Sequence, residues 1–341
     1  MAVFVIALCL FNQYDLFGYA ETRPYLLVGD SAAFAGFSRG WVELKADGDR
    51  YGAQIACELI APYDTVFFAT IEEDISISRL AMWLGPEVSR IIVGRQQLYW
   101  GVGRVFRPLD VFNPVNYFEP TYERPGSDAL LGYVAFGDMT SFRGIIQPRN
   151  KLDQSLYGAR LGMHILKNDI SISALHRRAD HMTLVGGDIA GELLVGYWGE
   201  YGYTKHDTLD YSTFTIGADY TFPFLLYVMA EYYFDGSGFG DPSDYDYSLI
   251  TEGLRATLGR HYIYASVSTL PSPLEVFRPS VSALVNIEDH GCILIPQVTI
   301  VPYENTDVTV GSNIFIGTND SEFVNLIPYD YAVYTWLRIY F

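Results

Sequence analysis

The segment that decides the fold is Tyr331-Ala332-Val333-Tyr334-Thr335-Trp336-Leu337-Arg338-Ile339-Tyr340-Phe341. Alternate residues form two rows, one with Val333, Leu337 and Ile339 and the other with Tyr334 and Arg338. This period of two is that of a β-strand whose faces meet different surroundings, and here one row suits lipid and the other suits water. An apolar edge strand promotes aggregation unless it is paired. We therefore expect this strand to pair with the first one and close a barrel.

Four residues of this segment carry a resemblance to the C-terminal assembly signal of bacterial outer-membrane β-barrels: Tyr331, Leu337, Ile339 and Phe341. The resemblance implies that the strand is recognised by barrel-assembly machinery and that the protein lies among outer-membrane lipid. The alternative is an edge strand of a soluble β-sandwich. The same alternating pattern recurs in many other segments, which favours the barrel.

The composition fits one large barrel. The 341 residues include 27 Tyr, 21 Phe and 31 Gly, charged residues make up 18 %, and the formal net charge is −18. Nucleic-acid binding needs a basic surface, so no nucleic-acid partner is expected. After residue 20, no apolar run reaches the roughly 18 residues that a membrane helix needs, so any crossing must use a closed sheet. Two cysteines in separate segments, Cys57 and Cys292, predict neither a disulfide framework nor a metal site.

The first part of the chain reads as a secretory signal peptide over residues 1–20. Its apolar run is too short to span a membrane, and Gly18-Tyr19-Ala20 supplies small residues where a signal peptidase reads. Residues 21–37 lack regular periodicity and are expected to form a periplasmic lead-in. The transmembrane barrel is then expected to comprise residues 38–341.

Alternating segments of about ten residues follow, separated by Gly, Asp, Asn or Pro, as in antiparallel up-and-down barrels. Two long polar segments, 236–246 and 317–330, should lie at the same end, yet an odd number of predicted strands separates them. One hairpin is therefore miscounted, and we place the error at residues 270–280, so the prediction is sixteen to eighteen strands. The predicted strands are 38–45, 51–60, 74–84, 89–100, 129–136, 138–147, 154–165, 168–178, 181–190, 194–205, 209–222, 225–235, 248–258, 260–268, 278–287, 291–302, 305–316 and 331–341.

The most unusual composition lies in residues 93–125, where Gly and Pro residues end a strand and impose a compact irregular loop. Loops of this length are usually functional. Planar guanidinium groups bind carboxylate and phosphate groups through paired hydrogen bonds, so we predict that residues 101–125 fold into the barrel and constrict a pore. The alternative is that the arginines pair with neighbouring acids and only pin the loop. The predicted constriction residues are Arg95, Gln97, Arg104, Arg107 and Arg124, with Asp110 and Asn113 shaping the loop.

Several short motifs in this region carry a second resemblance. They are Gly94-Arg95-Gln96, Trp100-Gly101, Pro108-x-Asp110 and Asn113-Pro114, with further matches at Asn286-Ile287-Glu288-Asp289, Pro296, Gly317 and Ser321-Glu322-Phe323. Together they resemble uncharacterised Gram-negative outer-membrane porin-like channels related to the alginate-export type. The resemblance implies a barrel and passage of small solutes, without a cofactor, and leaves the solute undefined.

Strand parity predicts which polar side chains face the lumen, because a charge on the lipid face at mid-depth costs about 2 to 4 kcal/mol. The lining that results has mixed charge. It fits a hydrated pore and equally an interior filled by paired charges. The predicted inward residues are Glu58, Arg95, Gln97, Arg143, Arg160, His164, Glu200, Asp219, Glu231, Arg255 and Arg338.

Two other functions remain open. A structural sleeve around a secretion or electron-transfer partner would need a wide, empty lumen. An outer-membrane hydrolase would cluster His206, Asp207 and a second acidic pair at one rim, with a base oriented by a carboxylate. No serine nucleophile or metal-ligand spacing accompanies these histidines, so no catalytic residue and no metal site are predicted.

Overall fold

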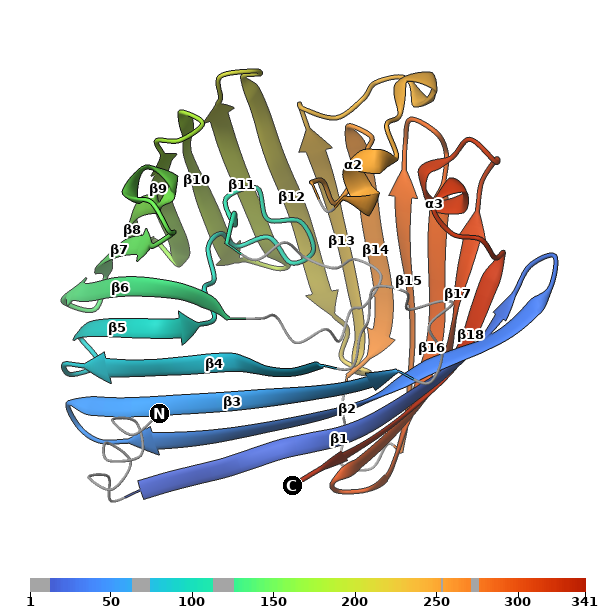
Figure 1. Cartoon of the computed structure of the whole chain (residues 1–341), viewed down its shortest axis with the longest axis horizontal. Helices are drawn as coiled ribbons and strands as arrows, with labels where there is room; N and C mark the ends of the chain where they lie inside the picture. The colour runs from blue at the N-terminus through green and yellow to red at the C-terminus, as the bar shows by residue number, and fades with distance from the viewer. Residues whose placement is uncertain (1–12, 63–73, 113–125, 253, 271–275) are drawn as a thin grey trace.

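The computed structural model describes residues 13–62, 74–112, 126–252, 254–270 and 276–341. Within them, eighteen strands form one antiparallel sheet that closes on itself, because β1 pairs with both β2 and β18. Figure 1 shows the strands following one another around the ring in chain order. The predicted all-β, up-and-down barrel is confirmed. The strands are β1 (Gln13–Val28), β2 (Ala32–Asp47), β3 (Tyr51–Pro62), β4 (Asp74–Leu84), β5 (Ser89–Gln96), β6 (Ser127–Phe136), β7 (Thr140–Gln147), β8 (Leu156–Ile165), β9 (Asn168–Arg177), β10 (Met182–Glu192), β11 (Gly196–Lys205), β12 (Tyr211–Thr221), β13 (Leu226–Asp235), β14 (His261–Thr269), β15 (Phe277–Asn286), β16 (Cys292–Tyr303), β17 (Thr306–Ile316) and β18 (Tyr331–Tyr340).

The alternation of side chains gives the sheet two different faces. On β12, Ile216 is 59 % exposed, whereas its neighbour Thr215 is 2 % exposed and points inward. On β18, Val333 and Ile339 are exposed on the outer face, and Tyr334 is buried on the inner face. Apolar residues therefore form the outer surface, while the inner surface mixes polar groups with packed aromatic rings.

The barrel closes where the first and last strands meet. Tyr19 lies opposite Tyr340, and Gly18 and Phe341 exchange two backbone hydrogen bonds of 3.0 Å. On the inner face of this seam, Glu21 accepts hydrogen bonds from Arg338 on β18 at 2.7 Å and from Arg39 on β2 at 3.3 Å. The expected pairing of the terminal strands is thus present, and one buried carboxylate joins three strands across it.

The predicted lead-in at residues 21–37 is instead part of the barrel wall. These residues belong to β1 and β2, and residues 13–20 form the first half of β1. The alternation was hidden because the inner row of β1 mixes Glu21 and Arg23 with Tyr25 and Leu27, so apolar and polar residues do not separate. A cleavage after Ala20 would divide β1. Residues 1–12 lie outside the described part, so the signal peptide itself stays a prediction.

A second correction concerns residues 248–258, which are not a strand. Ser248 donates from its backbone N–H and its hydroxyl to the Asp246 carboxylate, at 3.1 and 2.6 Å, and this turn begins the short helix α2 (Ser248–Thr251). The strand count of eighteen is right, with β1 taking the place of this segment. Four strands, β14 to β17, then separate the two long polar connections, and the error expected at residues 270–280 is not there, since β14 ends at Thr269 and β15 begins at Phe277.

The two ends of the barrel differ. Turns such as 166–167 and 304–305 join strands at one end, which we call the short-turn end. Connections 97–126, 236–260 and 317–330 join strands at the other, the long-loop end, where α2 and α3 (Glu322–Asn325) lie at the top right of Figure 1. No helix of the described residues is long and apolar enough to cross a membrane.

Three connections at the long-loop end meet at Glu322 on α3, whose carboxylate is buried. Its oxygens accept hydrogen bonds from the backbone of Leu258 at 2.9 Å, the Tyr262 hydroxyl at 2.5 Å and the Asn286 amide at 2.7 Å. Asp289 accepts from the backbone N–H of Glu322 at 2.7 Å. Burial raises the pKa of Glu322 to about 7, and the neighbouring Asp289 charge acts in the same direction.

We predict that the joined connections loosen as the pH rises through about 7. The raised pKa means that the folded protein binds the Glu322 proton more tightly than the unfolded chain does. The stabilising effect of this proton is therefore complete below the ordinary glutamate pKa of 4.5, and it is lost on deprotonation. Hydrogen exchange at Leu258, relative to an unfolded reference, should accelerate between pH 5 and 8, and Glu322→Gln should remove that dependence. Identical pH profiles for the two proteins would contradict this assignment.

Candidate functional site

The connection that follows β5 leaves the wall and enters the barrel interior, as the teal segment inside the ring of strands in Figure 1 shows. It is described as far as Phe112, and we call residues 97–112 the lumenal loop. The side chains of Trp100, Phe106 and Leu109 are buried almost completely. The loop is therefore packed against the wall along part of its length.

The Glu200 carboxylate on β11 holds the first turn of the lumenal loop. It is 3 % exposed and accepts backbone hydrogen bonds from Val102 at 2.8 Å, Gly103 at 3.1 Å and Leu109 at 2.6 Å. Gly101, with φ +93°, lies so close that an added Cβ would be 2.2 Å from the Glu200 carboxylate. Only glycine satisfies both the backbone conformation and this approach.

The Glu231 carboxylate on β13 holds the next turn in the same way. It is 1 % exposed and accepts from the backbone of Arg104 at 2.8 Å, Val105 at 3.1 Å and Phe106 at 2.7 Å. The Trp198 indole N–H adds a fourth bond of 2.6 Å. Burying a carboxylate is costly unless its oxygens are hydrogen-bonded, and here seven donors satisfy the two groups together.

Apolar contacts also hold the lumenal loop against the inner wall. Phe106 stacks on Tyr233 with ring centroids 4.4 Å apart and an interplanar angle of 4°. Leu109 lies over Gly186 and Gly202, where an added Cβ would come within 2.6 and 3.4 Å of its side chain. The wall therefore has glycine where the loop has bulk, so the two surfaces fit each other.

Arg104 and Arg107 lie on different sides of this anchored loop. Arg104 lies over the Trp198 ring at 5.3 Å and lines a cavity of about 580 Å³ that reaches the short-turn residues Lys167 and Leu194. Arg107 donates to the Gly103 carbonyl at 2.7 Å and lines a cavity of about 240 Å³ that reaches Arg255 in the long connection after β13. One guanidinium thus faces the short-turn side of the lumenal loop and the other faces the long-loop side.

Apart from Arg95, the other predicted constriction residues fall into two groups. Gln97 accepts a hydrogen bond from Tyr99 at 2.8 Å, and Asp110 accepts from the Phe112 backbone at 3.2 Å, which fits a loop-shaping role. Asn113 and Arg124 lie outside the described residues.

Arg95 requires a correction, because it lies on the outer face. It shares the outward row of β5 with Ile91 and Val93, and its side chain is 41 % exposed. It forms two hydrogen bonds of 3.0 Å with Asp128 on β6. The parity prediction failed because a paired guanidinium near a strand end can reach polar surroundings from the outer face.

The predicted lumen residues on strands lie on the inner face, and most have partners. Glu58 pairs with Arg39 at 3.0 Å, Arg160 with Asp188 at 2.6 Å, Asp219 with the Tyr227 hydroxyl at 2.9 Å, and Arg338 with Glu21 at 2.7 Å. Arg255 lies in a connection rather than in a strand and pairs with Asp235 at 2.7 Å. The inner wall on these strands is thus largely a network of opposite charges.

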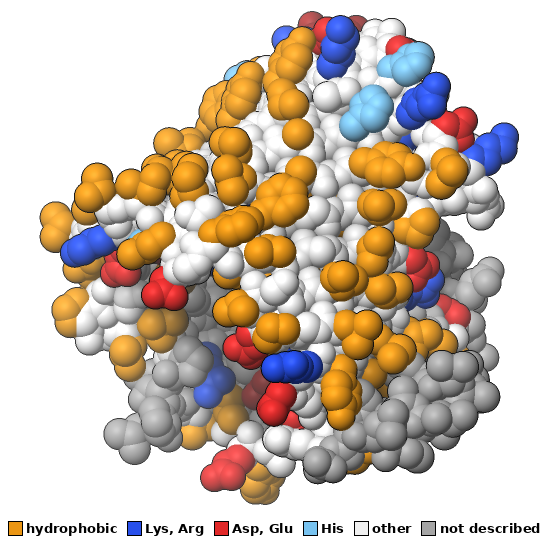
Figure 2. All heavy atoms as spheres, turned by 90° about the vertical axis from the view of Figure 1, so that its left-hand side faces the viewer, with side chains coloured by type: hydrophobic (Ala, Val, Ile, Leu, Met, Phe, Trp, Pro, Cys, Tyr) orange, Lys and Arg blue, Asp and Glu red, His pale blue; other side chains and the backbone are white. Residues whose placement is uncertain are grey.

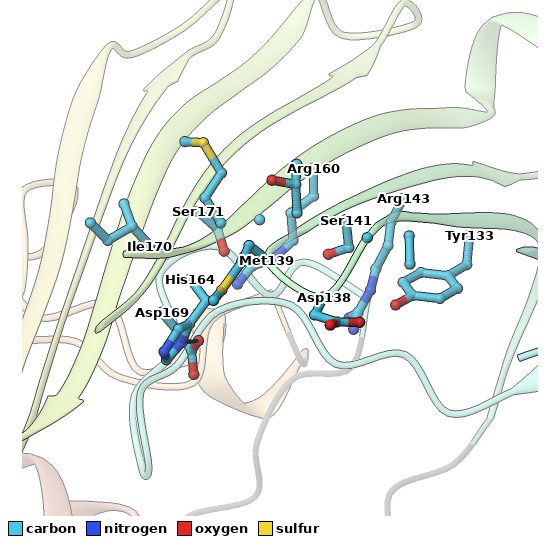
Figure 3. A pocket seen from close by; sticks show the side chains of 15 residues that line it. Tyr133, Asp138, Met139, Ser141, Arg143, Arg160, His164, Asp169, Ile170 and Ser171 are labelled. Atoms are coloured by element: carbon cyan, nitrogen blue, oxygen red, sulfur yellow. Dashed lines mark hydrogen bonds and ion pairs between the residues drawn. The ribbon is translucent and has the colours of Figure 1, made fainter. Parts of the chain in front are cut away.

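Arg143 differs from these residues. It stacks on Tyr133 at 5.7 Å, lies opposite Arg160 across the strand pair, and has no carboxylate within ion-pair distance among the described residues. Figure 3 shows the side chains of Arg143, Arg160 and His164 in a pocket of about 250 Å³ near the short-turn end, where His164 bonds Asp169 at 2.8 Å. This guanidinium is available to a solute.

Sequence reasoning missed the inner charges of the first strands. Arg23 is fully buried, ion-paired with Glu21 at 2.7 Å and stacked on Trp336 at 4.4 Å, and Arg79 pairs with Glu43. Arg23 lies in the segment that was read as a lead-in. Arg79 lies in a strand predicted with its observed bounds, 74–84, but a register shift between β3 and β4 interrupts the alternation there. Glu200 and Glu231 were found as inward residues, yet their role as anchors for backbone N–H groups had no signal in the sequence.

Two histidines, His181 and His206, lie close together at the rim of the long-loop end, as the hydrolase alternative required in part. His206 contacts Asp180 at 3.3 Å and Thr208 at 3.0 Å, and His181 contacts Asp207 at 2.9 Å. Asp180 also accepts hydrogen bonds from Arg177, and these bonds, together with the Arg177 charge, keep the pKa of that carboxyl well below its ordinary value. Both ring nitrogens of His206 are engaged within these turns, so the geometry is that of ion-paired turns. No group of three or more potential metal ligands occurs among the described residues.

Comparison with solved structures identifies the fold. No family model and no curated protein matches the chain. OprD from Pseudomonas aeruginosa superposes with a TM-score of 0.63 at 9 % identity, covering 97 % of this chain and 94 % of OprD. OccK9 (OpdG) of the same organism gives 0.65 at 8 % identity, covering 97 % and 98 %. OmpF of Salmonella typhi, in complex with daunomycin, gives 0.55 at 13 % identity, covering 97 % and 98 %. The fold is that of outer-membrane porins.

We predict that Glu231→Ala releases the lumenal loop from this porin-like wall. Three backbone N–H groups and one indole N–H lose their acceptor, at about 1 to 3 kcal/mol for each buried donor left unsatisfied. Hydrogen exchange over residues 102–109 should rise, and single-channel conductance should increase. Asp219→Asn is the matched control, because this inner carboxylate bonds Tyr227 and not the loop backbone. Unchanged exchange in Glu231→Ala would show that the anchor does not hold the loop.

Proposed function

We propose that the chain is an outer-membrane channel for passive passage of small polar or charged solutes, with a lumen narrowed by the lumenal loop. The observation that carries this proposal is the anchoring of that loop inside the barrel by Glu200 and Glu231. A loop held by six backbone hydrogen bonds keeps its position when solute and water pass beside it. The similarity to porins supports the same function at the level of the fold.

The guanidinium groups suggest which solutes the channel favours. Arg104 and Arg107 line cavities on the two sides of the loop, and Arg143 lines a third pocket on the inner wall. A planar guanidinium binds carboxylate or phosphate oxygens through two parallel hydrogen bonds. A solute with such a group would meet one arginine before the loop and another after it.

The other expectations belong to this proposal. They are an outer-membrane location, contact with membrane lipid, recognition of β18 by assembly machinery, removal of a signal peptide, and kinship with the alginate-export type of channel.

The sleeve alternative is disfavoured by the interior, because aromatic residues such as Phe106, Tyr262 and Phe323 pack inside the barrel. The inner cavities named above hold about 240 to 580 Å³, too little for a folded partner.

We predict that Arg104→Ala/Arg107→Ala shifts ion selectivity toward cations. Each guanidinium raises the local anion concentration, and an interaction of about 1 kcal/mol per charge corresponds to roughly fivefold. The reversal potential in a KCl gradient across a planar bilayer should move accordingly. Arg95→Ala is the control, since it removes an arginine paired with Asp128 on the outer face and should leave the potential unchanged. If the double variant also kept the native reversal potential, these two arginines would not lie on the ion path.

A further inference from the structure

We infer that the outer face of strands β5 to β10 binds a phosphate-bearing anionic lipid, with an acyl chain in a groove and the headgroup on a basic rim. This site is independent of solute passage through the lumen. It combines two features of that face, an apolar hollow and a cluster of unpaired cations beside it.

The hollow is a groove on the outward side of the sheet, which we call the acyl groove. Its volume is about 580 Å³. Its floor is a row of cross-strand partners without bulk, Gly132, Gly144, Ala159 and Ala174. Leu130, Ile146 and Tyr157 line the groove on one side of the floor. On the other side, the exposed residues Phe142 and Ile172 precede Gly144 and Ala174 by two positions on their strands.

The groove becomes polar toward the long-loop end. Tyr157 lies opposite His176, His176 opposite Thr183, and Thr183 opposite Lys205, so one outward row crosses from the groove to the rim. His176 and Thr183 are joined by a hydrogen bond of 3.0 Å. The Tyr157 hydroxyl donates to the Leu152 carbonyl at 3.2 Å, which ties the groove to the connection that bears Lys151.

Four exposed cations surround this end of the groove, and we call them the basic rim: Arg149, Lys151, Arg178 and Lys205. Ala179 donates its backbone N–H to the Asp153 carbonyl at 2.8 Å, so the connections that carry Lys151 and Arg178 lie side by side. Two acids of this region are engaged, since Asp180 pairs with Arg177 and Asp207 with His181. The exposed Asp153 carboxylate offsets part of the positive charge beside Lys151. None of the four rim cations forms an ion pair with another described residue.

Like charges gathered on a chain of net charge −18 indicate an anionic partner. Figure 2 faces this side of the molecule and shows Lys, Arg and His side chains, with some acidic ones among them, at the top of the view, above a surface that is mostly hydrophobic or backbone. A second copy docked through the same face would bring two basic rims together, which is repulsive. A lipid phosphate above and an acyl chain below satisfy both features at once.

A second hollow on the outer face supplies a matched comparison. It holds about 510 Å³ and is lined by residues that include Ile189, Gly199 and Ile216. None of the four rim cations borders it. Gly144 and Gly199 are equivalent for mutation, because an added Cβ would be no closer than 3.5 Å to Phe142 at the first and 3.8 Å to Ile189 at the second. Valine fits a strand at either position.

The test uses the full-length protein in detergent, with native mass spectrometry of bound phosphatidylglycerol and of phosphatidylcholine with the same chains. Arg178→Gln/Lys205→Gln should weaken phosphatidylglycerol binding by about 25-fold, or about fivefold for each cation, and leave phosphatidylcholine unchanged. Gly144→Val should weaken both lipids. Arg50→Gln/Lys167→Gln, at the short-turn end, and Gly199→Val, in the second hollow, should change neither.

Three results would overturn the inference. The first is that the rim variant binds phosphatidylglycerol within twofold of the native protein. The second is that the short-turn control loses as much phosphatidylglycerol binding as the rim variant. The third is that Gly144→Val binds both lipids like the native protein while its oligomeric state changes. The last result would assign the acyl groove to contact between copies. Heat-modifiable migration on gels verifies that each variant is a folded barrel. The rim and the groove are probed by separate substitutions, so if one variant fails to fold, the other still tests the inference.

Discussion

The closure of the sheet between β1 and β18 is the constraint on which the rest of the structure depends. In hydrocarbon every backbone N–H and C=O must be bonded within the protein, so an open edge is excluded and the last strand must find the first. The register that places Tyr19 opposite Tyr340 also places Glu21 between Arg338 and Arg39, so that backbone pairing and inner charges specify the same alignment. A slip by one residue would turn these charges toward lipid.

The lumenal loop shows how a barrel interior is filled without becoming an ordinary core. Two carboxylates, Glu200 and Glu231, would be costly in a dry interior, and the loop supplies the backbone donors that offset this cost. The carboxylates in turn stabilise the loop, because its backbone N–H groups have no strand partner and need an acceptor. The loop and the wall thus satisfy each other, and the arginines on the loop are left to face its two sides.

The barrel could be predicted from the sequence because the alternation of side chains is a local property, as on β12 and β18. The prediction failed on strands whose buried inner row contains both polar and apolar residues. On β1 the inner row is a mixture of Glu21, Arg23 and Tyr25, which reads as irregular until the closed sheet shows that the interior is partly packed. Residues 248–258 alternate like a strand, yet Asp246 starts a helical turn there. At the site, the irregular loop and its arginines could be predicted from Gly, Pro and Arg content. Its anchors could not, since which inner carboxylate meets which loop N–H depends on strands far apart in the chain.

The central proposal for this porin-like fold with an anchored loop is that water and ions pass beside the loop through the lumen. The most direct measurement is the current through the unmodified protein reconstituted in a planar lipid bilayer, with heat-modifiable migration used to verify a folded barrel. We expect discrete current steps that are stable over time, because the loop is held in place. A folded, bilayer-inserted protein that carried no current would contradict it and would assign the barrel a role other than passage.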